Sequence, residues 1–237
     1  MKTKIFIKQV ILLINMSCFF ISCEKEYLPD CTSGNCVNTN IKGSLYVKPT
    51  GEKLSNILVE VSFVYKNTMW FVVPHKVVSG KTDKNGIFNF NVTIDTTYFK
   101  EYSLWVRIPQ LENYISVHNI SLDYISMWFY DYDADVLQNI HFEFYKKAIL
   151  TINLNRTQMD DFDYFYLSYS YDGNIGFYAI TMPDLKFTTN EIFQLETAAD
   201  IYTTIWWTKR LKEETIDYKT DSLICKQNRD NIFNLNY

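Results

Sequence analysis

The sequence contains little of what catalysis, cofactor binding and metal binding require. Its three histidines, His75, His118 and His141, are scattered, and no two have the spacing of zinc ligands. The chain has no Gly-x-Ser-x-Gly elbow, no phosphate-binding P-loop and no Cys–His nucleophile pattern. We therefore expect no catalytic activity and no cofactor. Paired carboxylates of the kind used in glycoside hydrolysis stay open at this point, because their separation is a three-dimensional quantity.

Basic runs are missing as well. The chain has 23 Lys and Arg against 27 Asp and Glu, a formal charge of −4 and a pI near 5.4. A nucleic-acid surface needs clustered positive charge, so this balance argues against a nucleic-acid partner. No stretch shows a persuasive helical period, and only a turn is expected over residues 188–193.

The first 22 residues have the features of a secretory signal. Lysines precede an apolar stretch, and Ser22 supplies the small residue at the cleavage point. The alternative, an uncleaved membrane span, needs about 20 apolar residues. The run between Lys8 and Glu24 is shorter and contains Asn15, so we expect the segment to be removed as a signal peptide.

The residues before the cleavage point carry a family resemblance. Phe20-Ile21-Ser22-Cys23 resembles the lipobox of bacterial lipoproteins, although that family usually has Leu where this chain has Phe20. The resemblance implies that the thiol of Cys23 receives a diacylglycerol and that the new N-terminus is acylated. Several acyl chains hold a protein on a membrane far more firmly than one chain does. Cys18 is the competing candidate, but lipidation there would leave an apolar tail at the mature N-terminus.

The charged triplet Glu24-Lys25-Glu26 directly follows the lipobox. Together with the aromatic residues of the lipobox it is similar to Bacteroidetes-type lipoproteins. That resemblance implies a lipid-anchored protein of the outer membrane, on its periplasmic face or at the cell surface.

Composition and periodicity predict an all-β chain. Aromatic residues make up 17% of the sequence, with 18 Tyr and 17 Phe, and these residues favour strands. Apolar residues alternate with polar ones in many short runs separated by turn residues. We expect a lipidated tether at residues 23–40 and two consecutive β-sandwich domains, at residues 41–145 and 146–237.

The first of these domains has a recognisable pattern. Strand-like residues 43–47, 59–61 and 102–106 accompany the turn Thr82-Asp83-Lys84-Asn85-Gly86, in which Asp83 can accept from backbone N–H groups and Gly86 can adopt a positive φ. Together they resemble the carboxypeptidase regulatory-like domain, a transthyretin-like β-sandwich. The resemblance implies a non-catalytic accessory module, with an extra strand pair or loop around residues 68–78.

The second half predicts an Ig-like or fibronectin-like sandwich of unassigned family. The expected strands lie at residues 149–154, 164–171, 177–181, 192–196, 201–208, 222–226 and 231–235. The boundary between the two halves is soft, because one strand could run continuously through Lys146-Lys147.

Three cysteines follow the lipobox. Cys31 and Cys36 enclose a turn-prone Thr-Ser-Gly-Asn loop, which makes them a candidate disulfide in an oxidising compartment. Cys225 alternates with Leu223 on an expected strand, so we expect it to be buried as a small apolar residue.

One acidic segment invites a metal interpretation. Asp131, Asp133 and Asp135 could converge on a calcium ion, but the glycine and glutamate that an EF-hand loop needs are replaced by Val136 and Phe142. The segment is therefore either a looser calcium site or a solvated acidic loop.

Outward-facing aromatic residues give the strongest indication of a ligand. Alternation places Trp105, Tyr202 and Trp206 opposite core residues, where they can stack on sugar rings, anchor a protein interface or pack beneath loops. The leading hypothesis is a non-catalytic binding or scaffold module for an envelope protein or an extracellular polymer. The alternative is a glycan-binding lipoprotein of a polysaccharide-uptake system.

Overall fold

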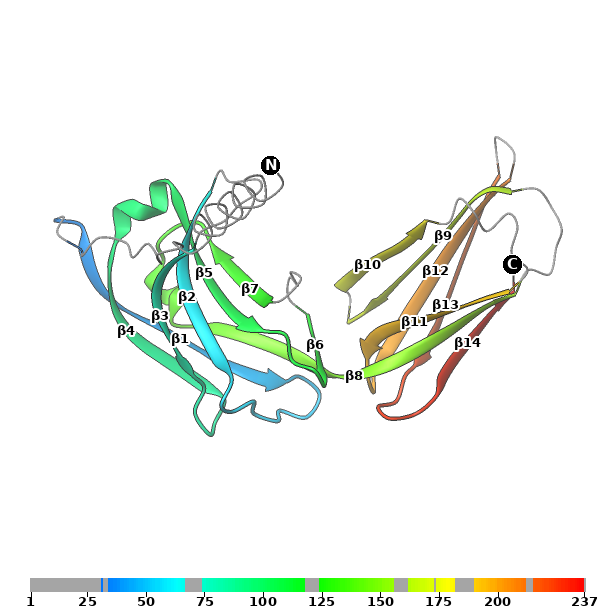
Figure 1. Ribbon diagram of the computed structural model, residues 1–237, viewed down its shortest axis with the longest axis horizontal. Helices are drawn as coiled ribbons and strands as arrows, with labels where there is room; N and C mark the ends of the chain where they lie inside the picture. The colour runs from blue at the N-terminus through cyan, green and yellow to red at the C-terminus, as the bar shows by residue number, and fades with distance from the viewer. Residues whose placement is uncertain are drawn as a thin grey trace, which may run out of the picture.

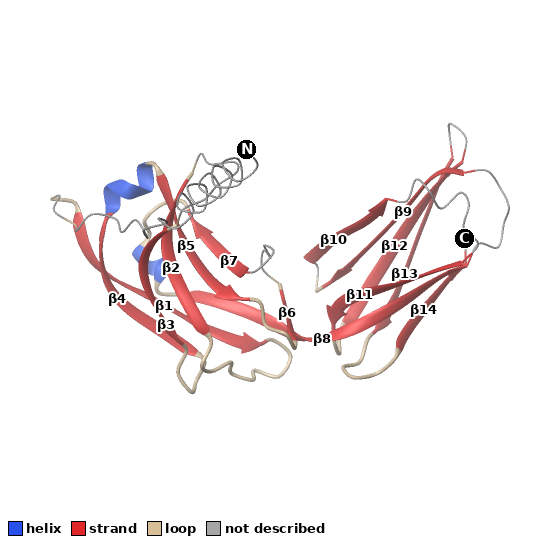
Figure 2. Ribbon diagram, viewed as in Figure 1, coloured by secondary structure: helices blue, strands red, loops and turns tan. Residues whose placement is uncertain are grey.

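The computed structural model describes residue 31 and residues 34–66, 74–117, 124–155, 162–172, 174–181, 190–211 and 215–236. These residues form fourteen strands in three sheets, with one 3-10 helix and one single-turn α-helix. Figure 1 shows the strands arranged as two sandwiches side by side, and Figure 2 shows how little helix they contain. The predicted all-β sandwich class is confirmed.

Each sheet draws on strands that are distant in sequence. One sheet is six-stranded and contains β1 (Cys36–Val47), β4 (Ile87–Asp95), β6 (Tyr114–Ser116), β8 (Ile140–Asn155), β11 (Asn190–Ala198) and β14 (Asn231–Asn236). A second has the order β3-β2-β5-β7 and consists of β2 (Leu58–Tyr65), β3 (His75–Lys81), β5 (Tyr102–Pro109) and β7 (Tyr124–Phe129). The third has the order β10-β9-β12-β13 and consists of β9 (Phe162–Tyr171), β10 (Asn174–Thr181), β12 (Tyr202–Leu211) and β13 (Thr215–Ile224).

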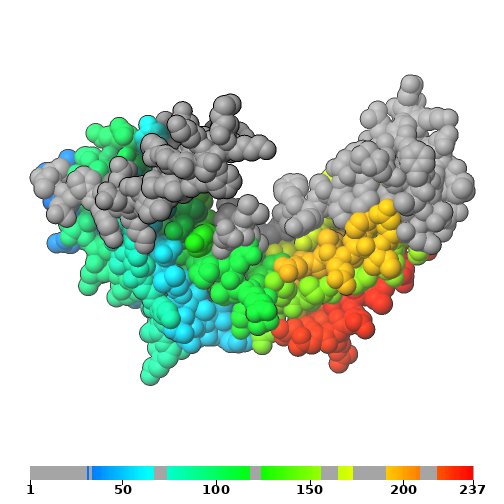
Figure 3. Space-filling view, viewed as in Figure 1, coloured from blue at the N-terminus to red at the C-terminus, as the bar shows by residue number. Residues whose placement is uncertain are grey.

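Strand β8 belongs to both sandwiches. Its first part lies parallel to β1, from Gly43↔Ile140 to Val47↔Phe144, and its second part pairs with β11 and β14. The strand crosses from one sandwich to the other in Figure 1, and in Figure 3 the two halves of the chain meet near the centre of the molecule. A single strand therefore sets the direction of one layer in each sandwich.

The inward side chains of β8 divide between two hydrophobic cores. Ile140, Phe142 and Phe144 pack in the first core, and Leu150 and Ile152 pack in the second. Alternate residues of one strand face the same side of a sheet, so the strand feeds both cores from one face. The division of the chain at residue 145 stays a prediction, and the strand itself is continuous across it.

The predicted turn before β4 is present and has the expected chemistry. The Asp83 carboxylate accepts hydrogen bonds from the backbone N–H of Asn85 at 2.8 Å and of Ile87 at 2.9 Å. Gly86 has φ +70°, and a Cβ there would lie 2.6 Å from the carbonyl oxygen of Leu45. Both the left-handed backbone and the close approach to β1 require glycine at this position.

Several sequence-based boundaries need correction. The predicted tether is too long, because residues 36–40 are the start of β1 and pair with β4 from Cys36↔Asp95 onward. The turn expected at residues 188–193 is wrong from residue 190, where β11 begins. Strand β7 was not expected from the sequence. The apolar pattern also predicted neither of the two short helices, η1 (Thr96–Lys100) and α2 (Ala134–Leu137).

Candidate binding sites

The outer face of the β3-β2-β5-β7 sheet carries a cluster of large side chains. On β5, Leu104, Val106 and Ile108 are buried in the core, so Trp105 and Arg107 face away from it. On the neighbouring β7, Tyr124, Ser126 and Trp128 face the same outer side, opposite Ile125, Met127 and Phe129. We call Trp105, Arg107, Tyr124 and Trp128 the aromatic face.

The members of the aromatic face contact one another in series. Trp105 and Trp128 lie directly opposite across β5 and β7, and their rings stack with centroids 4.8 Å apart and planes 22° apart. The Arg107 guanidinium lies 5.0 Å from the centroid of the Trp105 ring and 4.4 Å from that of Tyr124. Stacked rings and cation–π contacts of this geometry are attractive beyond simple burial.

A carboxylate from β2 fixes the guanidinium. Arg107 Nε donates to Glu60 Oε2 at 3.0 Å, and Arg107 Nη2 lies 2.9 Å from the same oxygen. Both side chains are mostly buried, with 16% and 22% exposed. This ion pair positions Arg107 between the two aromatic rings. Because the side chain is already ordered, it loses less conformational entropy when a partner binds.

Trp105 has one polar group without a partner. Its Nε1–H is buried and donates to no hydrogen-bond acceptor in the described part of the chain. An unsatisfied buried donor costs about 1–3 kcal/mol. Trp128, at the edge of the cluster, is 36% exposed and presents the outermost ring.

The three aromatic residues singled out from the sequence do not form one platform. Trp105 belongs to the first sandwich, whereas Tyr202 and Trp206 lie on β12 of the second. Tyr202 and Trp206 are four residues apart on the same face of one strand, about 13 Å at 3.3 Å per residue. Tyr202 is 64% exposed and borders a hollow of about 320 Å³ with Ser170, Asp172 and Thr204.

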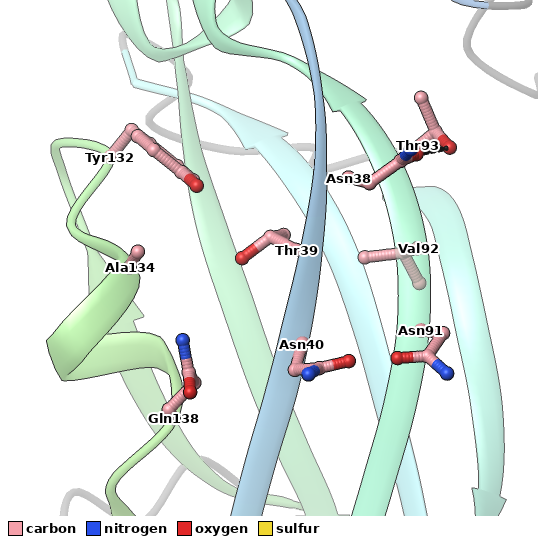
Figure 4. A pocket seen from close by; sticks show the side chains of 9 residues that line it. All are labelled: Asn38, Thr39, Asn40, Asn91, Val92, Thr93, Tyr132, Ala134 and Gln138. Atoms are coloured by element: carbon pink, nitrogen blue, oxygen red, sulfur yellow. Dashed lines mark hydrogen bonds between the residues drawn. The ribbon is translucent and has the colours of Figure 1, made fainter.

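A larger cavity, of about 520 Å³, lies along the first half of β1. Figure 4 shows β4 on one side of it and the α2 segment on the other. None of the described residues that line it is charged, and its lining is polar except for Val92 and Ala134. The lining residues are Asn38, Thr39, Asn40, Asn91, Val92, Thr93, Tyr132, Ala134 and Gln138. Clefts of about 300–1,000 Å³ are typical of small-ligand sites.

One residue of this cavity is incompletely satisfied. Thr39 is 8% exposed, and its Oγ1 has no hydrogen-bond partner among the described residues. Figure 4 shows its hydroxyl pointing toward the side of Tyr132 and Ala134. Nearby, Thr93 Oγ1 donates to Asn38 Oδ1 at 2.6 Å, while the amides of Asn40 and Asn91 face each other across β1 and β4.

The three aspartates of the acidic segment are not gathered into a metal site in the described structure. No group of three His, Cys, Asp or Glu side chains in the described part of the chain is placed to hold a metal ion, and Asp131, Asp133 and Asp135 fall within that part. Asp133 instead caps α2, because its carboxylate accepts from the backbone N–H of Asp135 at 2.9 Å and of Val136 at 3.1 Å.

The cysteines among the described residues lie in two environments. Cys31 and Cys36 form a disulfide at the start of β1, with an S–S distance of 2.03 Å. Cys225 is fully buried and free, and burial raises the pKa of its thiol, so it stays protonated and unreactive. Cys23, the predicted lipidation site, lies outside the described residues, as does His118.

A polar cluster joins the two sandwiches near the middle of β8. Lys48, just after β1, donates to Asp172 at 2.6 Å, and its Nζ lies 3.5 Å from Glu143. The hydrogen bond between Lys48 and Asp172 raises the pKa of Lys48 and lowers the pKa of Asp172, and a hydrogen bond from Tyr145 also lowers the pKa of Asp172. Tyr46 donates to Glu143 at 2.6 Å, and this bond raises the pKa of the phenol.

Three residues of the aromatic face, Arg107, Tyr124 and Trp128, were missed in the sequence. Trp128 lies on β7, in which both faces carry aromatic residues. The alternation of apolar and polar residues that identifies a half-buried strand is therefore absent. Arg107 alternates with Val106 and Ile108 exactly as Trp105 does with Leu104, and this spacing was the available indication.

No protein-family model matches the chain, and no curated protein matches it either. Among solved structures, it is similar to the Bacillus anthracis TIE protein, with 11% identity and a TM-score of 0.31, over 85% of this chain and 34% of that chain. It is also similar to the shaft pilin SpaA from Lactobacillus rhamnosus GG, with 9% identity and a TM-score of 0.32, over 84% of this chain and 98% of the pilin. For GBS52, the minor pilin of Streptococcus agalactiae, the identity is 6% and the TM-score 0.29, over 84% of this chain and 94% of that one.

The chain thus spans about a third of the TIE protein's length. TM-scores near 0.3 carry no argument about function, so the functional conclusion rests on the geometry of the chain itself. Among the described residues, no helix is both long enough and apolar enough to cross a bilayer.

Proposed function

We propose that this protein is a non-catalytic, lipid-anchored protein of the bacterial cell envelope that binds a protein partner through its aromatic face. The observation that carries the proposal is the stacked Trp105–Trp128 pair with Arg107 against it on the outside of a sheet. Trp, Tyr and Arg are the residues that dominate binding energy at protein interfaces. Here all three types lie in contact on adjacent strands.

The rigidity of the aromatic face supports this role. Its side chains stand on two paired strands, and Glu60 fixes Arg107 from a third. A surface that is ordered before binding loses little conformational entropy when a partner docks. Ser62 and Ser126, the small neighbours on the same side of the sheet, are only 2% and 4% exposed, so the large side chains stand together above them.

The anchor is proposed from the sequence. The lipobox resemblance implies that Cys23 carries the lipid, and the polar segment before β1 would link it to the first sandwich. Replacing Cys23 with Ala in the full chain should release the protein from the membrane fraction. If the Cys23→Ala protein still partitions with membranes after alkaline washing, lipidation at this residue is wrong.

The binding role is tested by comparing variants of the full chain in envelope co-purification. Trp128→Ala and Arg107→Ala should each lose the partner, because truncating an interface residue of this kind typically costs about 2 kcal/mol or more. Tyr218→Ala is the matched control, since Tyr218 is a 62% exposed aromatic residue on β13. Recovery of the same proteins with all three variants would contradict the proposed face.

Glycan binding is the second candidate, and the exposed ring of Tyr202 beside its hollow favours it. A polysaccharide array probed with the full chain and with Tyr202→Ala tests this directly. Binding that disappears only in the variant would place a sugar-stacking ring on β12. A full chain that binds nothing on the array would leave the protein-binding face as the function.

A further inference from the structure

The 520 Å³ cavity beside β1 is built from residues that the aromatic face does not use. We propose that this cavity binds a neutral carbohydrate, with the amides of β1, of β4 and of Gln138 after α2 bonding its hydroxyl groups. The site is independent of the proposed protein-binding function and does not include Tyr202, Trp105 or Trp206.

The lining has the hydrogen-bonding character of a sugar site. Three asparagines and one glutamine supply planar amides, each with an N–H₂ donor and a carbonyl acceptor. Two threonine hydroxyls and the Tyr132 hydroxyl add groups that both donate and accept. A sugar hydroxyl also donates and accepts, so neighbouring hydroxyls match such a surface without any charge.

The buried hydroxyl of Thr39 offers a hydrogen-bonding group to a ligand. It lies on the inward side of β1, while Asn38 and Asn40 lie on the outward side, and no described residue satisfies it. Buried polar groups in folded proteins nearly always have a partner, so an unpaired one among the residues that line a cavity marks a place where a ligand oxygen can bond.

One wall of the cavity is formed by residues 132–138, which include α2, and this wall favours a neutral ligand. Tyr132 offers a ring held against Phe99, with centroids 6.1 Å apart, and an aromatic ring packs against the C–H face of a sugar. Asp131 and Asp135 flank this wall without lining the cavity. Their charges repel phosphate and acidic sugars, and no lysine or arginine lines the cavity to offset them.

The fold leaves room for the ligand because β1 is paired on one side only along its first half. Strand β8 meets β1 at Gly43, where a Cβ would collide with the carbonyl of Ile140 and the ring of Phe88. Before Gly43, β4 continues along one edge of β1 and the α2 segment faces the other. A peptide strand could occupy this free edge instead, and the test distinguishes the two occupants.

The test is isothermal titration calorimetry of the full chain, solubilised in a detergent without a sugar head group. Cellotetraose, maltotetraose, mannotetraose and xylotetraose are the neutral probes, tetragalacturonate is the acidic probe, and an alternating Val-Thr octapeptide is the strand probe. We expect one neutral probe to bind, and Asn40→Leu and Gln138→Leu to weaken it by about tenfold or more. Asn153→Leu, a change on β8 away from the cavity, should leave binding unchanged.

Thr39→Val keeps the test independent of folding. It removes only a hydroxyl that has no partner in the described structure, so the melting temperature should hold or rise while sugar affinity falls. The proposal is overturned if no neutral probe binds, if tetragalacturonate or the octapeptide binds more tightly than every neutral probe, or if the cavity variants bind as well as the parent chain.

Discussion

The four-stranded sheet of each sandwich carries a tryptophan at a matching position. Only one of these two tryptophans belongs to a cluster of contacting side chains. Trp105 lies on β5 and Trp206 on β12, each on the third strand of a four-stranded sheet. Each lies opposite a buried serine on the second strand, Ser62 or Ser168. On the fourth strand the match ends, because Trp105 faces Trp128 whereas Trp206 faces Thr220.

The difference teaches how an outward aromatic residue should be interpreted. Trp206 has Ser168 and Thr220 as its cross-strand neighbours, and it has no ring partner among the described residues. Trp105 has a stacked ring and a fixed guanidinium, although its Nε1 has no hydrogen-bond partner among the described residues. An arrangement that tolerates this cost is better explained by binding than by stability, since a smaller apolar residue would cover the sheet without an orphaned donor.

The largest losses of stability should come from substitutions in the two hydrophobic cores, one in each sandwich. Phe142→Ala in the first core should cost about 3–5 kcal/mol, and Leu150→Ala in the second about 2–5 kcal/mol, because both side chains are fully buried. Hydrogen exchange measured by mass spectrometry should show Phe142→Ala loosening β2 and β5, and Leu150→Ala loosening β9 and β12.

The informative result is how far each loss spreads. The two side chains stand on one strand but in separate cores, so each variant should spare the other sandwich. Equal loss of protection in all four strands for both variants would mean that the sandwiches unfold as one unit and that β8 transmits the damage.

The sequence predicted the elements whose two faces differ clearly. Strands β1, β2, β4 and β5 follow from period-2 alternation, and the turn before β4 follows from Asp83 and Gly86. Strand β7 did not follow, because Tyr124 and Trp128 on its outer face are as aromatic as Phe129 on its inner face. Helix α2 is a single turn, which is too short for a 3.6-residue period to appear.

The candidate sites were only partly predictable for the same reason. Asn38 and Asn40 read as a polar tether, although they are the outward residues of a strand whose inward residues include Thr39 and Ile41. The cavity also needs Tyr132 and Gln138, nearly a hundred residues away, and no local pattern connects them to β1. Trp105 was found by alternation, but its partner Trp128 was not, so the stacked pair became visible only in three dimensions.

Buried threonines give a second, smaller contrast between the sandwiches. In the second sandwich the hydroxyls of Thr197 and Thr203 lie 2.7 Å apart and both residues are fully buried. Thr203→Val removes that partner and should cost about 1–2 kcal/mol. Thr39→Val in the first sandwich removes a hydroxyl without a described partner, so urea unfolding should show no loss. Equal losses in the two variants would show that Thr39 is already satisfied, which would weaken its role in the cavity.

The smallest effect should come from the ion pair between the two sandwiches. Lys48 and Asp172 are 43% and 30% exposed, so solvent screens them and Asp172→Asn should cost less than about 1 kcal/mol near neutral pH. The pKa of Asp172 is lowered in the folded chain, mainly by Lys48, so its contribution is present above the unfolded pKa of about 3.9 and disappears as pH falls through the lower folded value. The pKa of Lys48 is raised, so its contribution is lost only as the solution becomes strongly alkaline.

Urea unfolding of the parent chain and of Asp172→Asn, followed from about pH 7 to about pH 2, measures this difference directly. The gap between the two should close at the acid end and shrink at about 1 M salt, where screening acts within a few ångströms. Asp200→Asn is the control, because Asp200 pairs with Lys226 at 2.7 Å within the second sandwich alone. If Asp172→Asn alters hydrogen exchange in both β1 and β9 while Asp200→Asn alters neither, the pair couples the sandwiches. A gap that persists at acid pH would mean that the packing of Asp172 matters, and not its charge.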